Sequence, residues 1–341
     1  MSSSTEPSGG TRRRVAVIGA GGTIAMHGAH PFDWVDYFDT GIIHEIDAVL
    51  QNHPLHLPGI DVLPVTYKLL PSTGIQPHDW QQLAAFIATL RERHPGLDGI
   101  VLTHGTASLE ETAFFLSLIH DGPPIVIVGA QRPANTLGSD AIPNLRAAVA
   151  AAADPAVRPL GVCVVMDGYL YSARDVVKTG NHPLNAFEAV EFGPLARIEP
   201  DAAIAMLRAE APGSRLAVPY RNDPGRPLPR VDIVYSYAGA DGAAAAAFVQ
   251  AGARGLVSAG FPPGRCANGE RQALIDAVQA GVAVVQSSRA ARGAVPDQAY
   301  NRAVGILGGG RLTPQKARVL LMLMLHADLP KVTMQEFLLR V

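Results

Sequence analysis

The chain has 341 residues, a length typical of two domains, and 48% of them are hydrophobic, which is enough for two packed cores. Its 28 basic and 30 acidic residues leave a formal net charge of -2, so no overall field favours nucleic acid or an anionic membrane as a partner. The two cysteines, Cys163 and Cys266, are too few for a disulfide framework or a zinc site and suit a reducing cytoplasm. We therefore expect a soluble globular protein whose partner is a small molecule.

The first residues, 1–14, are rich in serine and glycine and end in three arginines. They contain no apolar stretch that could form the core of a signal peptide, so we expect a disordered tail. The longest strongly apolar run elsewhere, from Val319 to Leu325, is far too short to span a bilayer, and no membrane anchor is expected.

Short apolar and β-branched runs recur along the chain, separated by longer amphipathic or alanine-rich stretches. The expected strands are Val15–Ile18, Ile100–Leu102, Ile125–Val128, Val162–Met166, Ile233–Tyr235, Leu256–Val257 and Val282–Val285. The expected helices are His78–Arg93, Leu109–Ile119, Asn144–Ala153, Gly242–Ala251 and Glu270–Ala280. This alternation predicts an α/β fold in which helices flank a parallel sheet.

Two further signals mark the starts of helices. Ser108 and Glu111 have the spacing of a capping box, and Thr313 precedes Pro314, a residue that suits the first position of a helix. We interpret both signals as structural.

Five prolines, together with glycine and charged residues, lie between Glu210 and Arg230. This composition is typical of an interdomain linker, which we place at 210–230. The sequence therefore predicts a larger N-terminal α/β domain over 15–209 and a smaller α/β domain over 231–341.

Two segments deliver a threonine from an apolar strand into a glycine-containing turn. The segment Val15 to Met26 carries Thr23 after three glycines, and the segment Gly99 to Thr106 ends in a second threonine. Glycine allows a sharp turn and a close approach to a ligand, while a buried strand fixes where the turn lies. Two such threonines predict an active site based on hydroxyl groups.

A dinucleotide site is the first alternative, because Gly19 and Gly21 follow a strand. The fingerprint is incomplete, since Ile24 occupies its last glycine position and no strand ending in an acidic residue follows about 20 residues later. No cofactor is expected. His53 and His56 lie on a loop interrupted by proline, so a metal site is not expected either.

The chain resembles the bacterial-type L-asparaginase and glutaminase family at Gly21–Ala25 and at Thr103–Thr106, which is followed by Glu110–Ala113. The likeness covers nearly the whole chain and continues through Gly129–Pro133, Ser139–Asp140, Pro143–Leu145, Arg174–Val176, Lys178, Ser287–Arg289 and Pro314–Leu321. Several motifs in the family's order are far more specific than any single one.

The resemblance implies an amidohydrolase in which Thr23 attacks a side-chain carboxamide and forms an acyl-enzyme that water hydrolyses, releasing ammonia. A threonine hydroxyl needs a nearby proton acceptor, and Tyr37 in the following loop matches the tyrosine that contacts the nucleophile. Phe38 competes for the same position. Thr106 and Lys178 match the family's second threonine and its lysine, which would activate water or the hydroxyl and orient the amide.

The backbone N–H of Thr106 is expected to donate to an oxyanion. The resemblance gives His104 no catalytic part, so we interpret it as a structural hydrogen-bonding residue. Met26 to Gly41 is the expected lid over the site. The resemblance also implies a homodimer or homotetramer in which each site lies between the larger domain of one subunit and the smaller domain of another.

The departures from the family concern recognition of the substrate. The family uses a serine–glutamine pair, an aspartate after the second threonine, and an asparagine and a glutamate from the partner's smaller domain. Here Ser72 remains, but Thr73 replaces the glutamine, Ala107 replaces the aspartate and Gly239 replaces the asparagine. Ala130 completes the expected substrate-binding set. The missing aspartate is also the usual partner of the lysine, and the candidates to compensate are Asp167, Asp175, Asp241 and Asp297.

An ammonium group in a closed site needs carboxylate or amide oxygens, and losing a buried charge partner costs roughly a thousandfold in transition-state binding. We therefore expect weak or no activity on L-asparagine. The substrate would carry a carboxamide, and a carboxylate near Ser72, but either no free α-ammonium group or a bulkier and less polar group in its place. Two alternatives stay open: an ordinary L-asparaginase or glutaminase whose α-amino ligands come from Asp33, Asp36 or Asp39, and a catalytically decayed binding protein.

Overall fold

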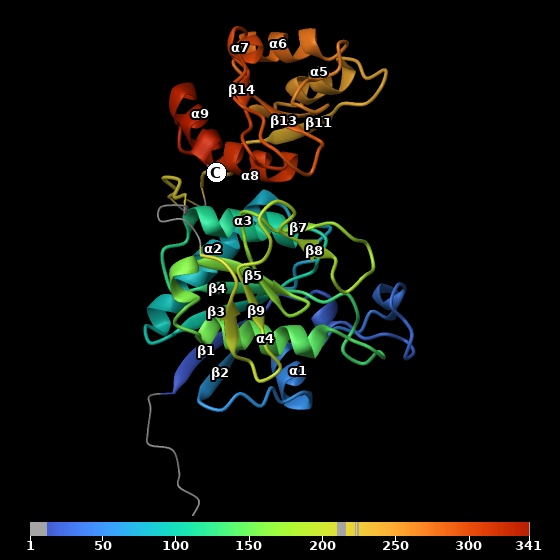
Figure 1. Ribbon diagram of the computed structural model, residues 1–341, viewed down its shortest axis with the longest axis vertical. Helices are drawn as coiled ribbons and strands as arrows, with labels where there is room; N and C mark the ends of the chain where they lie inside the picture. The colour runs from blue at the N-terminus through green and yellow to red at the C-terminus, as the bar shows by residue number, and fades with distance from the viewer. Residues whose placement is uncertain (1–11, 210–215, 222, 224, 341) are drawn as a thin grey trace, which may run out of the picture.

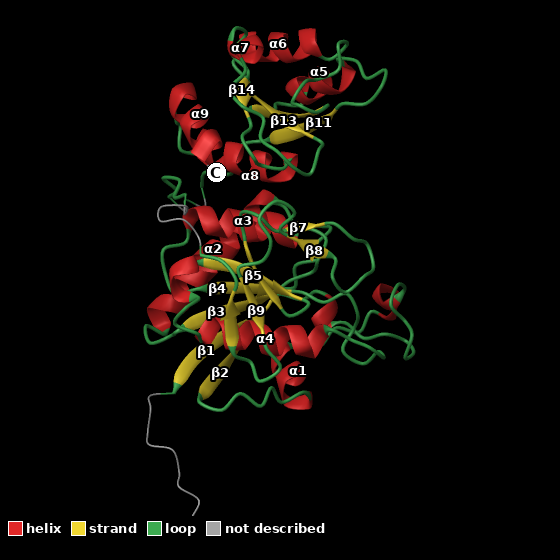
Figure 2. Ribbon diagram, in the orientation of Figure 1, coloured by secondary structure: helices red, strands yellow, loops and turns green. Residues whose placement is uncertain are grey.

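The computed structural model describes residues 12–209, 216–221, 223 and 225–340, which fold into two α/β domains (Figures 1 and 2). Residues 1–11 of the expected tail, and 210–215, 222 and 224 of the expected linker, lie outside the described residues. Across the ranges that the structure describes, no helix is long and apolar enough to cross a membrane.

The larger domain is built on an eight-stranded sheet with the strand order β10-β9-β6-β5-β4-β3-β1-β2. The strands from β2 to β5 are parallel, whereas β6, β9 and β10 run antiparallel to their neighbours, so the sheet is mixed and not wholly parallel as predicted. The strands are β1 (Arg13–Gly19), β2 (Ile60–Thr66), β3 (Gly99–Thr103), β4 (Ile125–Val128), β5 (Val162–Met166), β6 (Tyr169–Ser172), β9 (Ala196–Ile198) and β10 (Ile204–Met206).

The turn between β5 and β6 explains why the sheet becomes antiparallel. Asp167 and Gly168 form this turn, and both have a positive φ, 50° and 73°. A two-residue Asp-Gly turn with positive φ at both positions joins antiparallel strands, whereas a parallel neighbour needs a long crossover. The dipeptide is a hairpin signal that the prediction of a parallel sheet did not use.

Helices cover both faces of this sheet, so its central strands are buried on both sides. In β1, Val15 and Val17 face the layer of α1 and α4, while Ala16 and Ile18 face α2 and α3. All four residues are fully buried, which is why the strand is an unbroken apolar run. The helices of this domain are α1 (Ile46–Asn52), α2 (Pro77–Arg93), α3 (Leu109–Ile119) and α4 (Ala141–Ala153).

The smaller domain contains a four-stranded parallel sheet with the order β11-β12-β13-β14. Helices α5 and α6 pack together on one face of the sheet, and α8 packs on the other (Figure 2). The elements are β11 (Val231–Tyr235), α5 (Ala243–Gln250), β12 (Gly255–Gly260), α6 (Arg271–Gln279), β13 (Ala283–Ser288), α7 (Ala299–Arg302), β14 (Leu307–Gly308), α8 (Pro314–His326) and α9 (Lys331–Arg340).

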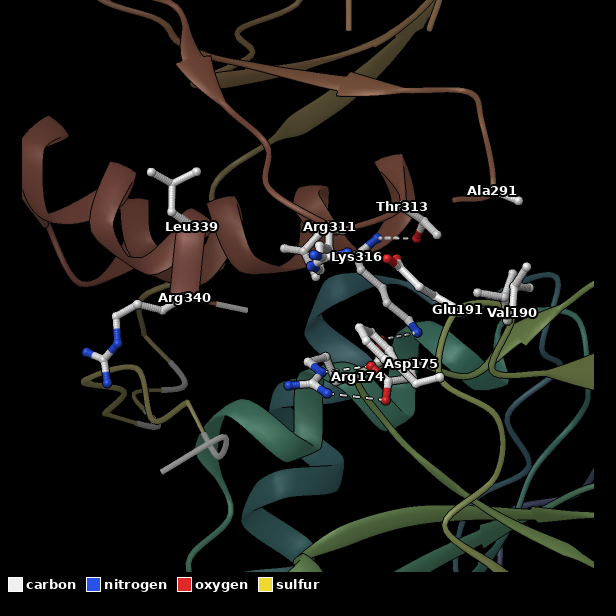
Figure 3. A pocket seen from close by; sticks show the side chains of 13 residues that line it. Arg174, Asp175, Val190, Glu191, Ala291, Arg311, Thr313, Lys316, Leu339 and Arg340 are labelled. Atoms are coloured by element: carbon white, nitrogen blue, oxygen red, sulfur yellow. Dashed lines mark hydrogen bonds and ion pairs between the residues drawn. The ribbon is translucent and has the colours of Figure 1, made fainter. Parts of the chain in front are cut away.

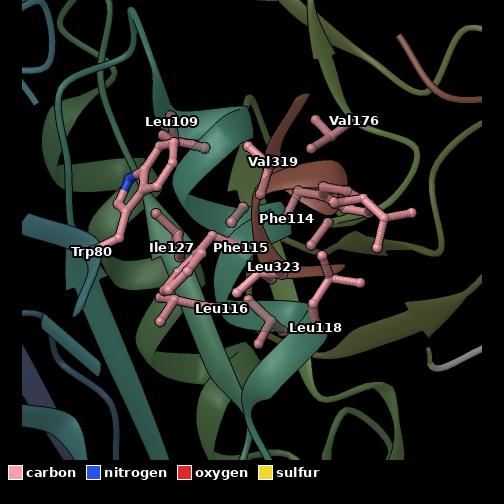
Figure 4. Packing of buried hydrophobic residues seen from close by; sticks show 14 of the residues in the cluster. Trp80, Leu109, Phe114, Phe115, Leu116, Leu118, Ile127, Val176, Val319 and Leu323 are labelled. Atoms are coloured by element: carbon pink, nitrogen blue, oxygen red, sulfur yellow. The ribbon is translucent and has the colours of Figure 1, made fainter. Parts of the chain in front are cut away.

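Helix α8 lies between the two domains and belongs to one hydrophobic core that spans both (Figures 1 and 4). It packs against α3 of the larger domain and against β11 and β12 of the smaller one. Val319 and Leu323 of α8 lie beside Phe114 of α3 (Figure 4). The apolar run from Val319 to Leu325 is thus a helix buried on nearly all sides.

The predicted strands and helices are present, with boundaries that differ by three residues or fewer. The cap at Thr313 is also present, since its Oγ1 accepts from Lys316 N at 3.4 Å. The capping box at Ser108 is wrong, because Ser108 Oγ instead donates to Ser72 O at 2.6 Å. Strand β2 was not predicted because Pro64 interrupts its pattern, and it lies at the sheet edge, where proline is tolerated.

The described part of the predicted linker packs against the larger domain. Val218 N donates to Leu118 O at 3.0 Å, and Leu228 N donates to Gln81 Oε1 at 3.4 Å. The side chains of Val218 and Leu228 are both buried in the core that spans the domains. The described part of this segment is thus held against α2 and α3 by hydrogen bonds and by buried side chains.

Substitution of Gly99 tests the packing of α4 on the sheet. A Cβ on Gly99 would lie 2.0 Å from Ala152 O, so we expect Gly99→Ala to lower the free energy of unfolding by about 2 kcal/mol because the helix must shift. In the control Gly96→Ala, the added Cβ meets only the flexible end of Arg14 at 3.2 Å. Urea denaturation compares the two variants, and equal losses would contradict the prediction.

Candidate active site

The two glycine-containing turns that carry the predicted threonines lie against each other. Thr23 follows β1 in the 3-10 helix η1 (Thr23–Ala25), and Thr106 follows β3, the parallel neighbour of β1. Gly22 has a φ of 82°, and a Cβ there would lie 2.5 Å from the carbonyl carbon of His104. Only glycine permits this approach, which brings both threonines to the same edge of the sheet.

Thr23 is paired with Tyr37 from the loop that follows it. Thr23 Oγ1 lies 3.0 Å from Tyr37 OH, and both side chains are buried. Phe38, the competing residue, stacks on the Tyr37 ring but is 61% exposed. Tyr37, and not Phe38, therefore contacts the predicted nucleophile.

Hydrogen bonds within and across the loop hold Tyr37 in place. The Asp33 carboxylate accepts from Ala29 N at 2.8 Å and from Asp36 N at 3.0 Å. Asn135 makes two hydrogen bonds to Gly28, one to its N–H at 2.8 Å and one to its carbonyl at 2.7 Å. These hydrogen bonds fix the loop with Tyr37 in contact with Thr23.

The environment of Tyr37 favours its protonated form. Burial raises the pKa of Tyr37, the hydrogen bond with Thr23 opposes this, and the negative charges of Asp140 and Asp33 raise the pKa further. Tyr37 is therefore a phenol at neutral pH. It can orient the Thr23 hydroxyl and relay a proton, but it does not serve as a phenolate base.

Thr106 is paired with Lys178, which lies on the short strand β7 (Val177–Lys178) beside β8 (Phe187–Glu188). Lys178 Nζ lies 2.7 Å from Thr106 Oγ1. Burial lowers the pKa of Lys178 from its ordinary value of 10.5, and the Glu110 carboxylate opposes this change. A lysine that loses its proton more easily can accept one from a hydroxyl group.

Glu110, which was not predicted to have a role, is the carboxylate that acts on Lys178. It is buried in the first turn of α3, and its Oε2 accepts from Lys178 N at 2.5 Å. Two of the expected partners form ion pairs elsewhere, Asp175 with Arg174 and Arg208, and Asp297 with Arg302. Asp241 accepts from the backbone of Ala243, and the pKa of Asp167 is affected by burial alone.

The geometry around His104 agrees with a structural role. His104 is fully buried, and burial lowers its pKa to about 4, so the ring is neutral. Its Nδ1 lies 2.7 Å from Gly105 O, its Nε2 lies 3.0 Å from Thr112 Oγ1, and Trp80 Nε1 donates to the same Thr112 oxygen at 2.9 Å. If the proton of the His104 ring is on Nδ1, each donor in this series of hydrogen bonds has an acceptor.

The predicted substrate-binding residues divide into two groups. Ser72 lies against the turn that carries Thr106, since a Cβ on Gly105 would be 2.5 Å from Ser72 Oγ. Thr73, which follows Ser72, and Ala107, which follows Thr106, are both exposed. Ala130 is instead fully buried in the core between the sheet and α4.

Both domains of the chain match one known family. Residues 14–210 match the family model "Asparaginase, N-terminal", and residues 230–338 match "Glutaminase/Asparaginase C-terminal domain". L-asparaginase 2 of Escherichia coli (strain K12) is 36% identical over 317 residues, 91% of this chain and 88% of that protein. Glutaminase-asparaginase of Acinetobacter glutaminasificans is 33% identical over 331 residues, 92% of this chain and 95% of that protein.

A solved structure agrees with this placement. The crystal structure of the probable cytoplasmic L-asparaginase from Campylobacter jejuni superposes with a TM-score of 0.85 and 32% sequence identity. The superposition covers 97% of this chain and 100% of that one.

The neutral His104 makes stability depend on pH. Because its pKa is about 4 in the folded chain against 6.5 ordinarily, the unfolded chain binds a proton first as the pH falls. We expect this contribution to be complete above about pH 6.5 and to fall by about 3 kcal/mol at pH 4. Urea denaturation across this range should give a flatter curve for His104→Gln, and parallel curves would contradict the prediction.

Proposed function

The chain belongs to the asparaginase family of amidohydrolases, and we propose that it hydrolyses the carboxamide of a small substrate to a carboxylate and ammonia, with Thr23 as the nucleophile. One observation carries this proposal: two threonine hydroxyls on adjoining turns each have a partner that can move a proton. Thr23 lies 3.0 Å from Tyr37, and Thr106 lies 2.7 Å from Lys178.

In the first half of the proposed reaction, Thr23 Oγ1 attacks the carbonyl carbon of the amide. The proton of its hydroxyl is relayed through Tyr37, and the Thr106 N–H donates to the oxyanion that forms. Tyr37 passes its own proton on to the amide nitrogen as it receives the one from Thr23, so the carbon–nitrogen bond breaks and ammonia leaves. The product of this half is an ester between Thr23 and the acyl group.

In the second half, water attacks the ester carbonyl. The neutral amine of Lys178 takes a proton from Thr106, which in turn takes one from the attacking water. The ester bond breaks, and the proton held by Lys178 is returned to the departing Thr23 oxygen, which releases the acid and restores both the Thr23 hydroxyl and the neutral amine. The lowered pKa of Lys178 supports this assignment, because the ammonium form has no lone pair with which to accept a proton.

We propose that the substrate carries a carboxylate near Ser72 but has no free α-ammonium group, or has a bulkier and less polar group in its place. Ala107 and Thr73 offer no charge at the positions where the family binds the ammonium group. Both oxygens of Asp33 already bind backbone N–H groups of their own loop. Asp33 is thus already engaged within its own loop.

An ordinary L-asparaginase or glutaminase is the second candidate, and the names of the relatives favour it. It requires that residues such as Asp36 and Asp39, which are exposed, hold the α-ammonium group. A decayed enzyme that only binds its ligand is less well supported, because both hydroxyl pairs are intact.

We further propose that the enzyme acts as a homodimer or homotetramer in the cytoplasm. Tyr235 and Tyr237 support the assembly, since they are 57% and 58% exposed at the end of β11, just before Gly239. The family uses this loop at the partner's site. Cys163 and Cys266 form no disulfide in the part of the chain that the structure describes, which supports a reducing compartment.

Ammonia release from a panel of amides tests the nucleophile and the substrate class. The panel contains L-asparagine, L-glutamine and analogues that lack or block the α-amino group. We expect turnover of the analogues, a loss of about a thousandfold or more in Thr23→Val, which keeps the shape but lacks the hydroxyl, and partial activity in Thr23→Ser. Strong turnover of L-asparagine by the unaltered enzyme would support the second candidate instead.

The substitution Ala107→Asp tests the missing ammonium ligand directly. A carboxylate beside Thr106 should attract an α-ammonium group, so we expect kcat/KM for L-asparagine to rise about tenfold or more. Analogues without the amino group should not gain, and neither should the neutral control Ala107→Asn. Equal gains in the two variants would show that charge is not the missing element.

A further inference from the structure

Lys316 reaches from the smaller domain into the larger one. It lies on α8, and its ammonium group donates to Arg174 O at 2.7 Å and to Val176 O at 2.5 Å. Figure 3 shows the side chain extending from α8 toward the segment that carries Arg174 and Asp175, beside an interdomain cavity of about 340 Å³. Lys316 is 1% exposed, so this buried cation joins α8 to the segment that leads into β7.

Glu110 is influenced by the charges of two lysines, Lys316 and Lys178. Its carboxylate accepts the backbone N–H of Lys178 and is 7% exposed. The charges of both lysines act on it, and its own charge acts on both of them. Three ionisable groups, from α3, β7 and α8, thus act on one another, and one of them, Lys178, contacts the Thr106 hydroxyl.

The balance among these charges decides whether Lys178 can lose its proton. A buried carboxylate by itself would hold Lys178 in its ammonium form, whereas a second cation offsets that carboxylate. Burial raises the pKa of Glu110, while Lys316, the Lys178 N–H and the Lys178 charge favour the carboxylate. Burial lowers the pKa of Lys316 to about 8, so at neutral pH it remains a cation and donates to its two carbonyls.

The charged groups around these three residues have partners of their own. Arg174 and Asp175, which face Lys316, form an ion pair with each other, and Asp175 also binds Arg208. On α3, Glu111 lies 3.6 Å from Arg318 of α8. On β8, Glu188 Oε1 accepts from Thr179. Glu110 is the carboxylate whose charge acts on Lys178.

We propose that Glu110 and Lys316 are positioning residues that together set how readily Lys178 takes a proton from Thr106, and that Lys316 makes this setting depend on the docking of α8. The inference rests on the proposed role of Thr106 and Lys178 in hydrolysis. The smaller domain then takes part in the chemistry of its own subunit, because Lys316 on α8 supplies the positive charge that offsets the Glu110 carboxylate.

The test compares Glu110→Gln with Glu111→Gln, its neighbour on α3. Glutamine keeps the shape of Glu110 and an oxygen that can accept from Lys178 N, but it removes the charge. We expect the acidic limb of the pH profile of kcat/KM to move about one pH unit lower in Glu110→Gln and to stay in place in Glu111→Gln. An unmoved limb in Glu110→Gln, or equal movement in both, would overturn the proposal.

Lys316→Met provides an independent second variant. It keeps the apolar stem, and it leaves the charge of Glu110 without its balancing cation. We expect the acidic limb to move about one pH unit higher, opposite to the change in Glu110→Gln. Movement in the same direction, or none in a variant whose circular dichroism shows the native fold, would contradict the proposed balance.

A readout without turnover separates this inference from the proposed function. The chain has only four lysines, Lys68, Lys178, Lys316 and Lys331, so the ¹³Cε resonances of labelled lysine can be resolved and Lys178 assigned with Lys178→Met. The titration midpoint of Lys178 should fall in Glu110→Gln and rise in Lys316→Met. If no amide on the panel is hydrolysed, the proposed function fails while these midpoints still decide the inference. Unchanged midpoints would overturn it.

Discussion

The site depends on one close approach of backbone, between Gly22 and the segment His104–Gly105. A side chain at Gly22 would place a carbon atom 2.5 Å from the neighbouring carbonyl carbon, so the two turns meet only because this residue is glycine. The parallel register of β1 and β3 then sets Thr23 and Thr106 at one edge of the sheet. Their partners come from a loop and from a short strand that converge on this point.

Much of the fold could be predicted because the central strands are buried on both faces and therefore contain unbroken apolar runs, as in β3 and β4. Edge elements carry a weaker signal. Strand β2 contains Pro64 and is only partly buried, so it lacks the unbroken apolar run. The antiparallel half of the sheet follows from the Asp167–Gly168 turn, whose φ values distinguish a hairpin from a crossover.

The candidate site could be predicted where a motif is continuous in sequence and not where residues meet only in space. Thr23 and Thr106 stand in glycine-containing motifs that point to chemistry, whereas Glu110 belongs to the matching stretch Glu110–Ala113 but has the ordinary place of an acidic residue in the first turn of a helix. Only the fold shows that Glu110 accepts from Lys178. Ser108 has the right spacing for a cap, but a tertiary hydrogen bond to Ser72 O competes successfully for its hydroxyl.

The position of α8 means that the division between the domains in sequence is not a division in packing. Residues 210–230 separate the two halves along the chain, yet α8 is buried against α3, and Lys316 donates to carbonyls of the other half. Each half alone would expose an apolar face, and the first would leave two carbonyls without this donor. If the chain were cleaved within 210–230, the two fragments would therefore remain associated. Activity should then be recoverable by mixing two separately produced fragments.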